Sequence, residues 1–332
     1  MNIMEDIYRK AKSNPQLIAF PEIEEEKILR AAKESKDLGI CQPVLVGKQS
    51  EIEKYADKYD ISLEGMKIAN CEDKEWLDSL IQRYVSINPL NSIKSMKRKS
   101  KDSLYVALMM EALDEIDATF AGMSHTTGEV IMAGQLIVGM QEGITTISSV
   151  GIANITGYDG PEGEILVIGD SAVCINPSEE DLASIAISAC DTAKTLLGWD
   201  PRCALVSFST TGSNEHELVD KVRNAVKIAN ELRPDYKIDG EFQLDAAICP
   251  NVAAKKVKRP SEVAGKANII IWPDLNVGNV AVKLLQQFAQ TDAYGPILQG
   301  FKKVVCDCSR SAPVSELLGN VAISAVRAQG GK

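Results

Sequence analysis

The chain has 332 residues, enough for two domains of ordinary size, each with a well-buried core. Hydrophobic residues make up 45% of it and charged residues 25%, which is typical of a globular protein. The net charge of -10 argues against non-specific binding to nucleic acid, because a phosphate backbone is held by many Lys and Arg side chains.

No apolar run reaches the roughly 20 residues that span a bilayer, and residues 1–12 are polar, unlike a signal peptide. We therefore expect a cytoplasmic protein that makes no membrane contact. The eight cysteines are scattered without a CxxC pair, and the chain has only two histidines. This usage predicts neither a disulfide framework nor a zinc site, and no metal is expected.

The first part of the chain alternates between helix-like and strand-like patterns. The predicted helices are 3–13, 24–38 and 104–116, and the predicted strands are 17–22, 42–47 and 118–122. The stretch "KSMKRKSK", residues 94–101, is strongly basic and is typical of a solvated surface that could also meet a polyanionic ligand.

The second part of the chain repeats this alternation. A turn-rich segment, 154–164, predicts a hairpin or a lid near a domain boundary. The elements expected after it are a strand at 164–170, a helix at 178–198, a strand at 203–209, a helix at 216–234, the segments 238–248 and 267–275, and a helix after Asn279. The start of the helix at 178 is marked by Ser178 followed three residues later by Asp181. This order of elements predicts an α/β fold with mostly parallel sheets covered by helices.

Several predicted strands end in small polar residues. These junctions are "AGMSHTTGE" (121–129), "SFSTTGSN" (207–214), "PDLNVGN" (273–279) and "GPILQG" (295–300). In doubly wound folds ligands bind at the carboxyl ends of strands, where loop N–H groups and helix N-termini favour anions. The same residue types are also ordinary turn and cap residues, so each junction is weak evidence by itself. The chain contains neither GxGxxG nor GxxxxGK[ST], so no dinucleotide fingerprint or Walker loop is predicted.

Long ordered stretches of the chain resemble the phosphate acetyltransferase (phosphotransacetylase) family of phosphate acetyl/butyryltransferases. The stretches are "LIAFPE", "SHTTGE", "GDSAVCINPSEEDLASIAI", "SFSTTGS", "KIDGEFQLDAA", "VAGKANIIIWPDLNVGN" and "GPILQG". The resemblance implies reversible transfer of an acyl group between an acyl phosphate, most often acetyl phosphate, and coenzyme A. It implies no tightly bound cofactor, with coenzyme A and phosphate as substrates, and a homodimer.

The resemblance also implies two α/β domains with the active cleft between them. The first domain takes back the C-terminal segment, so we expect domains at 1–146 with 298–332 and at 147–297. The candidate substrate-binding residues lie at the strand-to-loop junctions: Ser124, His125, Thr126, Thr127, Ser209, Thr210, Asn276, Gly278, Asn279, Gln299 and Gly300.

The catalytic residues implied by the resemblance lie in "VVCDCSRSAPVSELLGN", residues 304–320. Ser309 positions the thiol of coenzyme A, Arg310 steadies charge on the reacting phosphate and carbonyl, and the carboxylate of Glu316 takes the thiol proton.

A thiol pKa of about 8.5 and a carboxyl pKa of about 4.3 leave this proton transfer roughly 6 kcal/mol uphill. Burial of the carboxyl or a cation beside the thiolate must therefore help, and Arg310 is the obvious cation. Without the resemblance, Ser309 is a turn residue and Glu316 a first-turn helix carboxylate. Asp307 and Asp274 are interpreted as loop caps.

Three departures from the family pattern are visible. The family carboxylate is an Asp, whereas this chain has Glu316. Two family arginines are absent: Ile87 and Asn88 stand where one would fall, and Met132 or a neighbour stands in place of the other. Charge-assisted contacts are worth about 1.5–3 kcal/mol each, so their loss weakens the expected binding.

Two interpretations of these departures stay open. In one, the chain is an acyltransferase in which Lys97, Arg98 or Lys99 replaces the arginines, or whose acyl group is another, such as propionyl or butyryl. In the other, it is a lapsed paralogue with a binding, regulatory or assembly role. The first interpretation, an active acyltransferase, is favoured because the chain retains Ser309, Arg310 and the carboxylate of Glu316.

Overall fold

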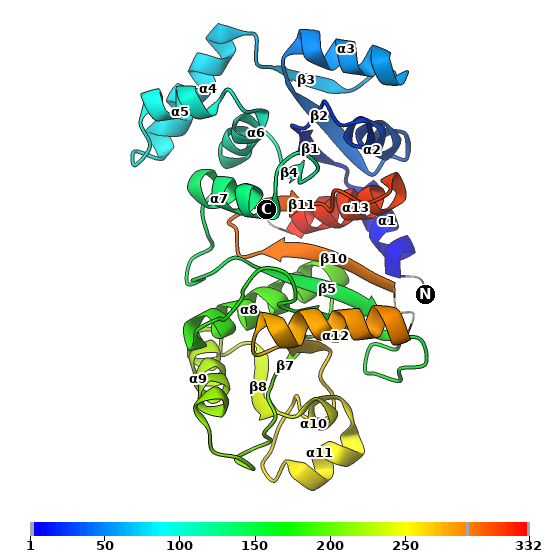
Figure 1. Ribbon diagram of the computed structural model, residues 1–332, viewed down its shortest axis with the longest axis vertical. Coiled ribbons are helices and arrows are strands. Elements are labelled where there is room, and N and C mark those ends of the chain that lie inside the picture. Colours follow the sequence, from blue (N-terminus) through cyan, green and yellow to red (C-terminus); the bar gives the residue numbers. More distant parts are fainter. Residues whose placement is uncertain (1–2, 290–291, 331–332) are drawn as a thin grey trace. The chain divides into compact units, whose positions relative to one another are not determined.

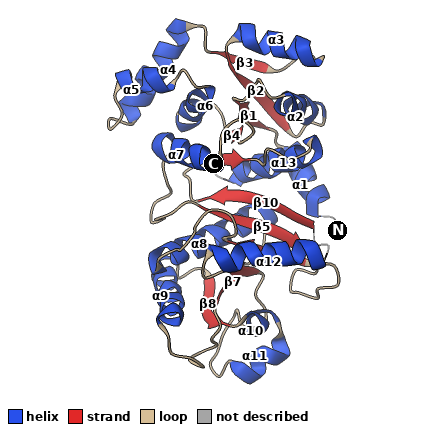
Figure 2. Cartoon of the chain, viewed as in Figure 1, coloured by secondary structure: helices blue, strands red, loops and turns tan. Residues whose placement is uncertain are grey.

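The computed structural model describes residues 3–289 and 292–330. The chain divides into two compact units, unit 1 formed by Met1–Gly139 with Phe301–Lys332 and unit 2 by Met140–Gly300. Helices flank a sheet in each unit, as Figures 1 and 2 show. The α/β fold class predicted from the sequence is confirmed, whereas the limits of functional domains stay a prediction.

Unit 1 is built on a five-stranded sheet in which every pair of neighbours is parallel. In spatial order the strands are β11 (Val304–Asp307), β4 (Ala118–Ala121), β1 (Gln16–Phe20), β2 (Cys41–Gly47) and β3 (Lys67–Asn70). All four residues of β4 are buried, as expected for a strand that is covered on both faces. Because the strands are parallel, the carboxyl ends of β11, β4 and β1 lie side by side at one edge of the sheet.

The helices of unit 1 cover both faces of this sheet (Figure 1). They are α1 (Ile3–Ser13), α2 (Glu26–Asp37), α3 (Gln49–Tyr59), α4 (Lys74–Ile87), α5 (Ile93–Lys99), α6 (Ser103–Ala112), α7 (Thr127–Ile137) and α13 (Val314–Gly330). Helix α13 packs against α1 and α2, and α6 packs against α4 and α7. The last helix of the chain therefore completes the core of the unit formed by the first residues.

Unit 2 contains a mixed six-stranded sheet. Its spatial order is β10 (Asp292–Gln299), β5 (Ser148–Asn154), β6 (Ile165–Gly169), β9 (Ile269–Ile271), β7 (Arg202–Val206) and β8 (Lys237–Phe242). Strands β6, β9, β7 and β8 are parallel, and β5 and β10 add an antiparallel edge. Its helical segments are α8 (Glu179–Thr192), a π-helical turn (Ala193–Leu197), α9 (Glu217–Leu232), α10 (Leu244–Ile248), α11 (Pro250–Lys256) and α12 (Leu275–Phe288).

Helix α12 begins before the position that the sequence predicted. Its first residue is Leu275, and the carboxylate of Asp274 caps it by accepting a hydrogen bond from the N–H of Val277 at 3.1 Å. Asn and Gly are poor helix formers, so the stretch "NVGN" looked like a loop. By contrast, the helix start predicted at Ser178 is confirmed, because Ser178 and Asp181 form a reciprocal capping box.

Glu111 is a fully buried carboxyl in the core of unit 1. Its Oε2 accepts a hydrogen bond from Thr119 on β4 at 2.6 Å, and its buried Oε1 has no side-chain partner among the described residues. Burial raises the pKa of Glu111 to about 8, although the bond from Thr119 opposes this shift. The folded protein therefore binds this proton more tightly than the unfolded chain does.

We expect Glu111→Gln to stabilise the protein at high pH. A raised carboxyl pKa favours folding at low pH, and this contribution is lost as pH rises from about 4.5 to about 8. The amide introduced in the variant does not ionise, so the variant does not lose stability in this way. The unfolding free energy of the variant minus that of the wild type should therefore be on the order of 2–3 kcal/mol larger at pH 9 than at pH 5. Urea unfolding at both pH values measures it. Glu115→Gln, at a partly exposed ion pair with Arg83, is the control and should show no such gain.

No helix among the described residues is long and apolar enough to cross a membrane.

Candidate functional site

The predicted residues of unit 1 gather at the carboxyl edge of its sheet. Strands β1, β4 and β11 are direct neighbours, and each ends in a polar segment. Glu22 follows β1, residues 122–127 follow β4, and the Ser309–Arg310 pair follows β11. Segments that are far apart in the sequence are thus placed together by the parallel register.

The carboxylate of Glu22 organises the loop between β4 and α7. The Glu22 side chain is only 1% exposed, so its hydrogen bonds face little competition from water. Its two oxygens accept hydrogen bonds from the N–H groups of Gly122 at 3.1 Å, Met123 at 2.7 Å and His125 at 3.0 Å. The ring of His125 adds a fourth contact, from Nδ1 at 2.8 Å. One buried side chain therefore fixes the backbone that leads into α7.

His125 lies between two carboxylates. Its Nδ1 contacts Glu22, and its Nε2 contacts Asp102 Oδ2 at 3.1 Å. The bonds to Asp102 and then to Glu22 raise the pKa of His125 to about 10, outweighing the opposing effect of burial. His125 is therefore an imidazolium at neutral pH, and both of its ring nitrogens are engaged within the protein.

The other predicted residues of this loop also have internal partners. Ser124 donates to Glu24 Oε1 at 2.6 Å. Thr126 is the N-cap of α7 and forms a capping box with Glu129. Thr127, the first residue of α7, donates from Oγ1 to Asp307 Oδ2 at 2.6 Å. This last bond ties α7 to the end of β11, the strand that leads into the Ser309–Arg310 turn.

The turn after β11 presents Ser309 and Arg310 to solvent. Both residues are exposed, and the Ser309 hydroxyl lies 3.0 Å from that of Ser311. The Arg310 guanidinium has no hydrogen-bond or ion-pair partner among the residues that the structure describes. Lys27 of α2 holds the end of the turn, donating from Nζ to the carbonyl of Ala312 at 2.9 Å.

Glu316 lies in the first turn of α13 and is exposed. Within residues 3–289 and 292–330, its carboxylate forms no hydrogen bond or ion pair with Ser309 or Arg310. The proton-accepting role that the resemblance gives Glu316 therefore stays a prediction.

In unit 2, the predicted residues Ser209 and Thr210 lie in the loop after β7. Ser209 is fully buried and donates to Glu241 Oε1 at 2.8 Å. The same carboxylate accepts from the N–H of Gly212 and pairs with Arg223 through Nε at 2.9 Å. Thr210 Oγ1 accepts from the N–H of Gln243 at 2.9 Å. Glu241 thus shapes this loop as Glu22 shapes the loop in unit 1.

Three predicted residues lie in the first turns of α12. Asn276 and Asn279 are exposed, and Asn279 donates to the carbonyl of Ser171 at 3.3 Å. Gly278 is buried, and a Cβ at this position would lie 2.2 Å from the carbonyl oxygen of Asp170. Only glycine lets the helix approach the loop after β6 this closely, which explains its presence inside a helix.

Gln299 and Gly300 lie at the end of β10. The Gln299 side chain is 1% exposed, and its amide nitrogen donates to Ser148 Oγ at 2.9 Å and to the carbonyl of Ile185 at 3.2 Å. Its oxygen accepts from Thr192 at 3.2 Å. The Gln299 amide therefore satisfies polar groups inside unit 2, while its predicted contact with substrate stays a prediction.

The described residues contain no cluster of three or more His, Cys, Asp or Glu side chains that could hold a metal ion. Asp274, which the sequence analysis interpreted as a loop cap, is the N-cap of α12. Asp307 is more than a cap, since its side chain is 5% exposed and contacts a neighbouring helix.

Comparisons with known proteins agree with the resemblance seen in the sequence. The model of the phosphate acetyl/butaryl transferase family matches residues 2–325. The chain belongs to this family. A phosphate acetyltransferase of Thermoanaerobacterium thermosaccharolyticum is 40% identical over 332 residues, which cover 99% of this chain and 100% of that protein. A phosphate acetyltransferase of Clostridium acetobutylicum is 37% identical over 333 residues, with 100% of both chains covered.

A solved structure agrees as well. A phosphotransacetylase from Streptococcus pyogenes is 32% identical, covers 98% of each chain and has a TM-score of 0.90. The chain is thus an enzyme of the phosphate acyltransferase type.

Sequence reasoning missed several side chains that shape this phosphate acyltransferase. Glu22 and Glu241 are buried carboxylates that follow or end apolar strands, and this position was the only local sign of their role. Lys221 of α9 was also missed: its Nζ donates to the carbonyls of Pro177 and Pro273, both at 3.2 Å. It thereby joins the loop after β6 to the loop after β9.

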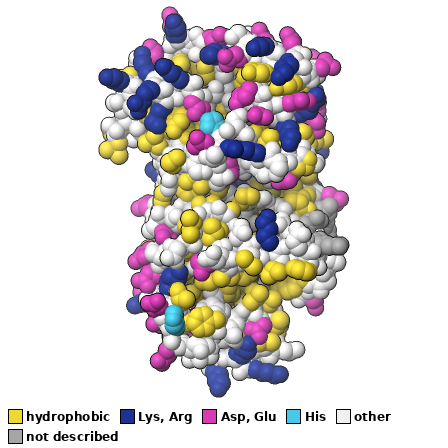
Figure 3. All heavy atoms as spheres, viewed as in Figure 1, with side chains coloured by type: hydrophobic (Ala, Val, Ile, Leu, Met, Phe, Trp, Pro, Cys, Tyr) yellow, Lys and Arg dark blue, Asp and Glu magenta, His cyan; other side chains and the backbone are white. Residues whose placement is uncertain are grey.

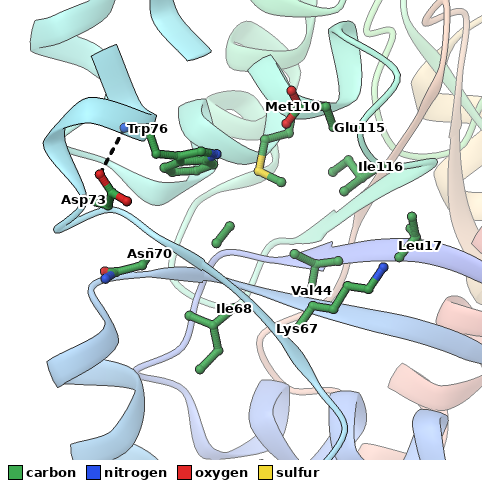
Figure 4. Close-up of a pocket in the computed structure, with 11 residues that line it drawn as sticks. Leu17, Val44, Lys67, Ile68, Asn70, Asp73, Trp76, Met110, Glu115 and Ile116 are labelled. Carbon is green, nitrogen blue, oxygen red and sulfur yellow. Dashed lines mark hydrogen bonds between the residues drawn. The ribbon is translucent and has the colours of Figure 1, made fainter. Parts of the chain in front are cut away.

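A cavity of about 350 Å³ lies in unit 1 away from these residues (Figure 4). Its wall is mainly apolar, with Trp76 and Met110 on one side and Ile68 and Val44 on the other. It contains none of the predicted site residues.

Proposed function

We propose that the chain catalyses reversible acyl transfer between an acyl phosphate and coenzyme A, with acetyl phosphate as the acyl donor. The observation that carries this proposal is the exposed Ser309–Arg310 pair at the carboxyl edge of a parallel sheet, the edge at which ligands bind in such folds. A guanidinium that none of the described residues engages is available to hold two phosphate oxygens at once. The names of the relatives support acetyl phosphate as the substrate.

The proposed reaction is a direct attack of sulfur on the acyl carbon. The thiol of coenzyme A gives its proton to Glu316, and the sulfur attacks the carbonyl carbon of the acyl phosphate. The bond between that carbon and the bridging oxygen breaks, and phosphate leaves with the electron pair. Ser309 orients the thiol, and Arg310 stabilises charge on the thiolate, the carbonyl oxygen and the departing phosphate.

The proposed enzyme takes coenzyme A as its second substrate, holds no tightly bound cofactor and acts as a homodimer in the cytoplasm. An apolar stripe on α12 supports self-association. Val277, Val280, Leu284 and Phe288 are exposed along it, and apolar side chains gather over this helix in Figure 3.

One observation favours a second candidate, a family member that has lost turnover. Ile87 is 59% exposed and Met132 is 62% exposed, at positions where the family pattern has arginines. The basic side chains that gather over α5 in Figure 3 are the candidates to replace them. Of these, Lys97 pairs with Asp78 and Lys99 lies over the ring of Tyr105, which leaves Arg98 the most available.

A substrate panel separates the two candidates. We expect purified protein to form thioester from coenzyme A and acetyl phosphate, with slower turnover of propionyl and butyryl phosphates. Glu316→Gln keeps the size of the side chain but cannot take a proton, so its kcat should fall by about 100-fold or more. Ser315→Ala, at the exposed neighbouring position, serves as the control and should leave turnover unchanged. A folded wild-type protein without turnover of any acyl phosphate would establish the second candidate instead.

A further inference from the structure

Asp307 ends β11 two residues before Ser309, and its two carboxylate oxygens have different surroundings. Oδ2 accepts the hydrogen bond from Thr127 at 2.6 Å. Oδ1 is buried and has no hydrogen-bond partner in the described part of the chain. A buried carboxylate oxygen without a donor is unfavourable, so its retention needs an explanation.

The backbone around Asp307 is arranged to admit this carboxyl. Gly122, after β4, has a φ of +117, and a Cβ there would lie 2.5 Å from Asp307 Oδ1 and 2.5 Å from the backbone nitrogen of Cys308. Any larger residue at position 122 would collide with the Asp307 side chain. The ends of β4 and β11 therefore meet at the carboxyl of Asp307.

Three groups from different segments act on Asp307. Thr127 faces it from α7, the Glu22 carboxylate acts from the end of β1, and Arg310 acts from the turn that follows β11. Burial raises the pKa of Asp307 to about 6, the bond from Thr127 lowers it, the charge of Glu22 raises it, and the charge of Arg310 lowers it. Arg310 follows Asp307 by three residues in the turn after β11, which places it between this carboxyl and the proposed phosphate site.

We propose that Asp307 is a positioning residue of the acyl-transfer site, which holds α7 through Thr127 and sets, by its own charge, how strongly Arg310 attracts the phosphate group of the substrate. This inference rests on the proposed function, in which Arg310 binds that phosphate. When Asp307 is ionised, its negative charge offsets part of the field of Arg310 and repels an anion. When Asp307 takes up a proton, this repulsion ends, while the guanidinium N–H groups of Arg310 can still donate to two phosphate oxygens.

The test compares Asp307→Asn with the wild type between pH 5 and 8. Asn is neutral at every pH and keeps an oxygen that can accept the bond from Thr127. We expect KM for acetyl phosphate at pH 7.5 to be about 2- to 5-fold lower in the variant, the size of a screened charge pair. The ratio of the two KM values should approach one at pH 5. The ionisation of acetyl phosphate changes both KM values by the same factor, so it does not affect their ratio.

The variant Thr127→Val provides an independent test if Asp307→Asn does not fold. It removes the donor that lowers the pKa of Asp307, so the pH at which KM changes should move upward, and kcat should fall because α7 loses its tie to β11. A purely structural role for Asp307 would lower kcat in both variants without moving this pH dependence. A ratio of KM values that stays flat from pH 5 to 8 would overturn the inference.

Calorimetry with inorganic phosphate separates this inference from the proposed function, because it needs no turnover. Tighter phosphate binding by Asp307→Asn than by the wild type at pH 7.5, with the difference lost at pH 5, supports the inference even in an inactive protein. Normal turnover with no pH-dependent difference in either assay overturns the inference and leaves the proposed function standing. Absence of both turnover and phosphate binding in the wild type overturns both.

Discussion

Arg310→Ala should lower kcat/KM for acyl transfer by about 100- to 1000-fold, the loss expected when one group that stabilises transition-state charge is removed. Arg310 is exposed and has no hydrogen-bond or ion-pair partner among the described residues, so its removal breaks no contact of this kind. Stability should therefore change by less than about 0.5 kcal/mol. Such a loss of activity without a loss of stability is expected of a residue that acts on substrate.

Initial rates of thioester formation measure this effect, with thermal unfolding of the same samples. Arg310→Lys keeps the positive charge but not the planar fork, so it should recover only part of the rate. Lys302→Ala removes another exposed cation of unit 1 and should leave the rate unchanged. Turnover by Arg310→Ala equal to that of the wild type would contradict the role proposed for the turn after β11.

Local patterns predicted much of the fold and the position of the Ser309–Arg310 turn. An apolar run followed by small polar residues marks the end of a buried strand, and such a run placed the end of β4 within one residue. The cap at Ser178 was predictable for the same reason, since both members of the capping box lie within one turn.

The contacts that shape the site could not be predicted in this way, because they join distant segments. His125 meets Glu22 across 103 positions, and Thr127 meets Asp307 across 180. Both contacts depend on the strand order β11-β4-β1, in which the last strand of the chain lies beside β4. No periodicity within the sequence specifies that neighbour. Asp307 therefore looked like a loop cap until the sheet placed α7 against it.

Glu22→Ala should strongly destabilise the protein, because the Glu22 carboxylate anchors the loop between β4 and α7. The change removes the acceptor of three backbone N–H groups and of the His125 ring, all held by a carboxylate that is 1% exposed. Breaking a buried charge pair typically costs about 3–5 kcal/mol in unfolding free energy. We therefore expect a large fall in the urea midpoint, together with lost turnover because residues 122–127 lose their anchor.

The charge of His125 gives this prediction a second, more specific measurement. Without Glu22, one of the two carboxylates that raise the pKa of His125 is absent, so the pKa should fall toward its ordinary value of 6.5. The chain has only two histidines, so imidazole proton resonances can resolve the titration. In the wild type the His125 signal should not titrate between pH 5 and 8, whereas in a folded fraction of the variant its titration should move downward toward this range, because only Asp102 still raises its pKa. The control is Glu24→Ala, which removes an exposed carboxylate two residues further on and should change neither the urea midpoint nor the His125 titration. If both variants had the same effect, the burial of Glu22 would not be the cause of the lost stability.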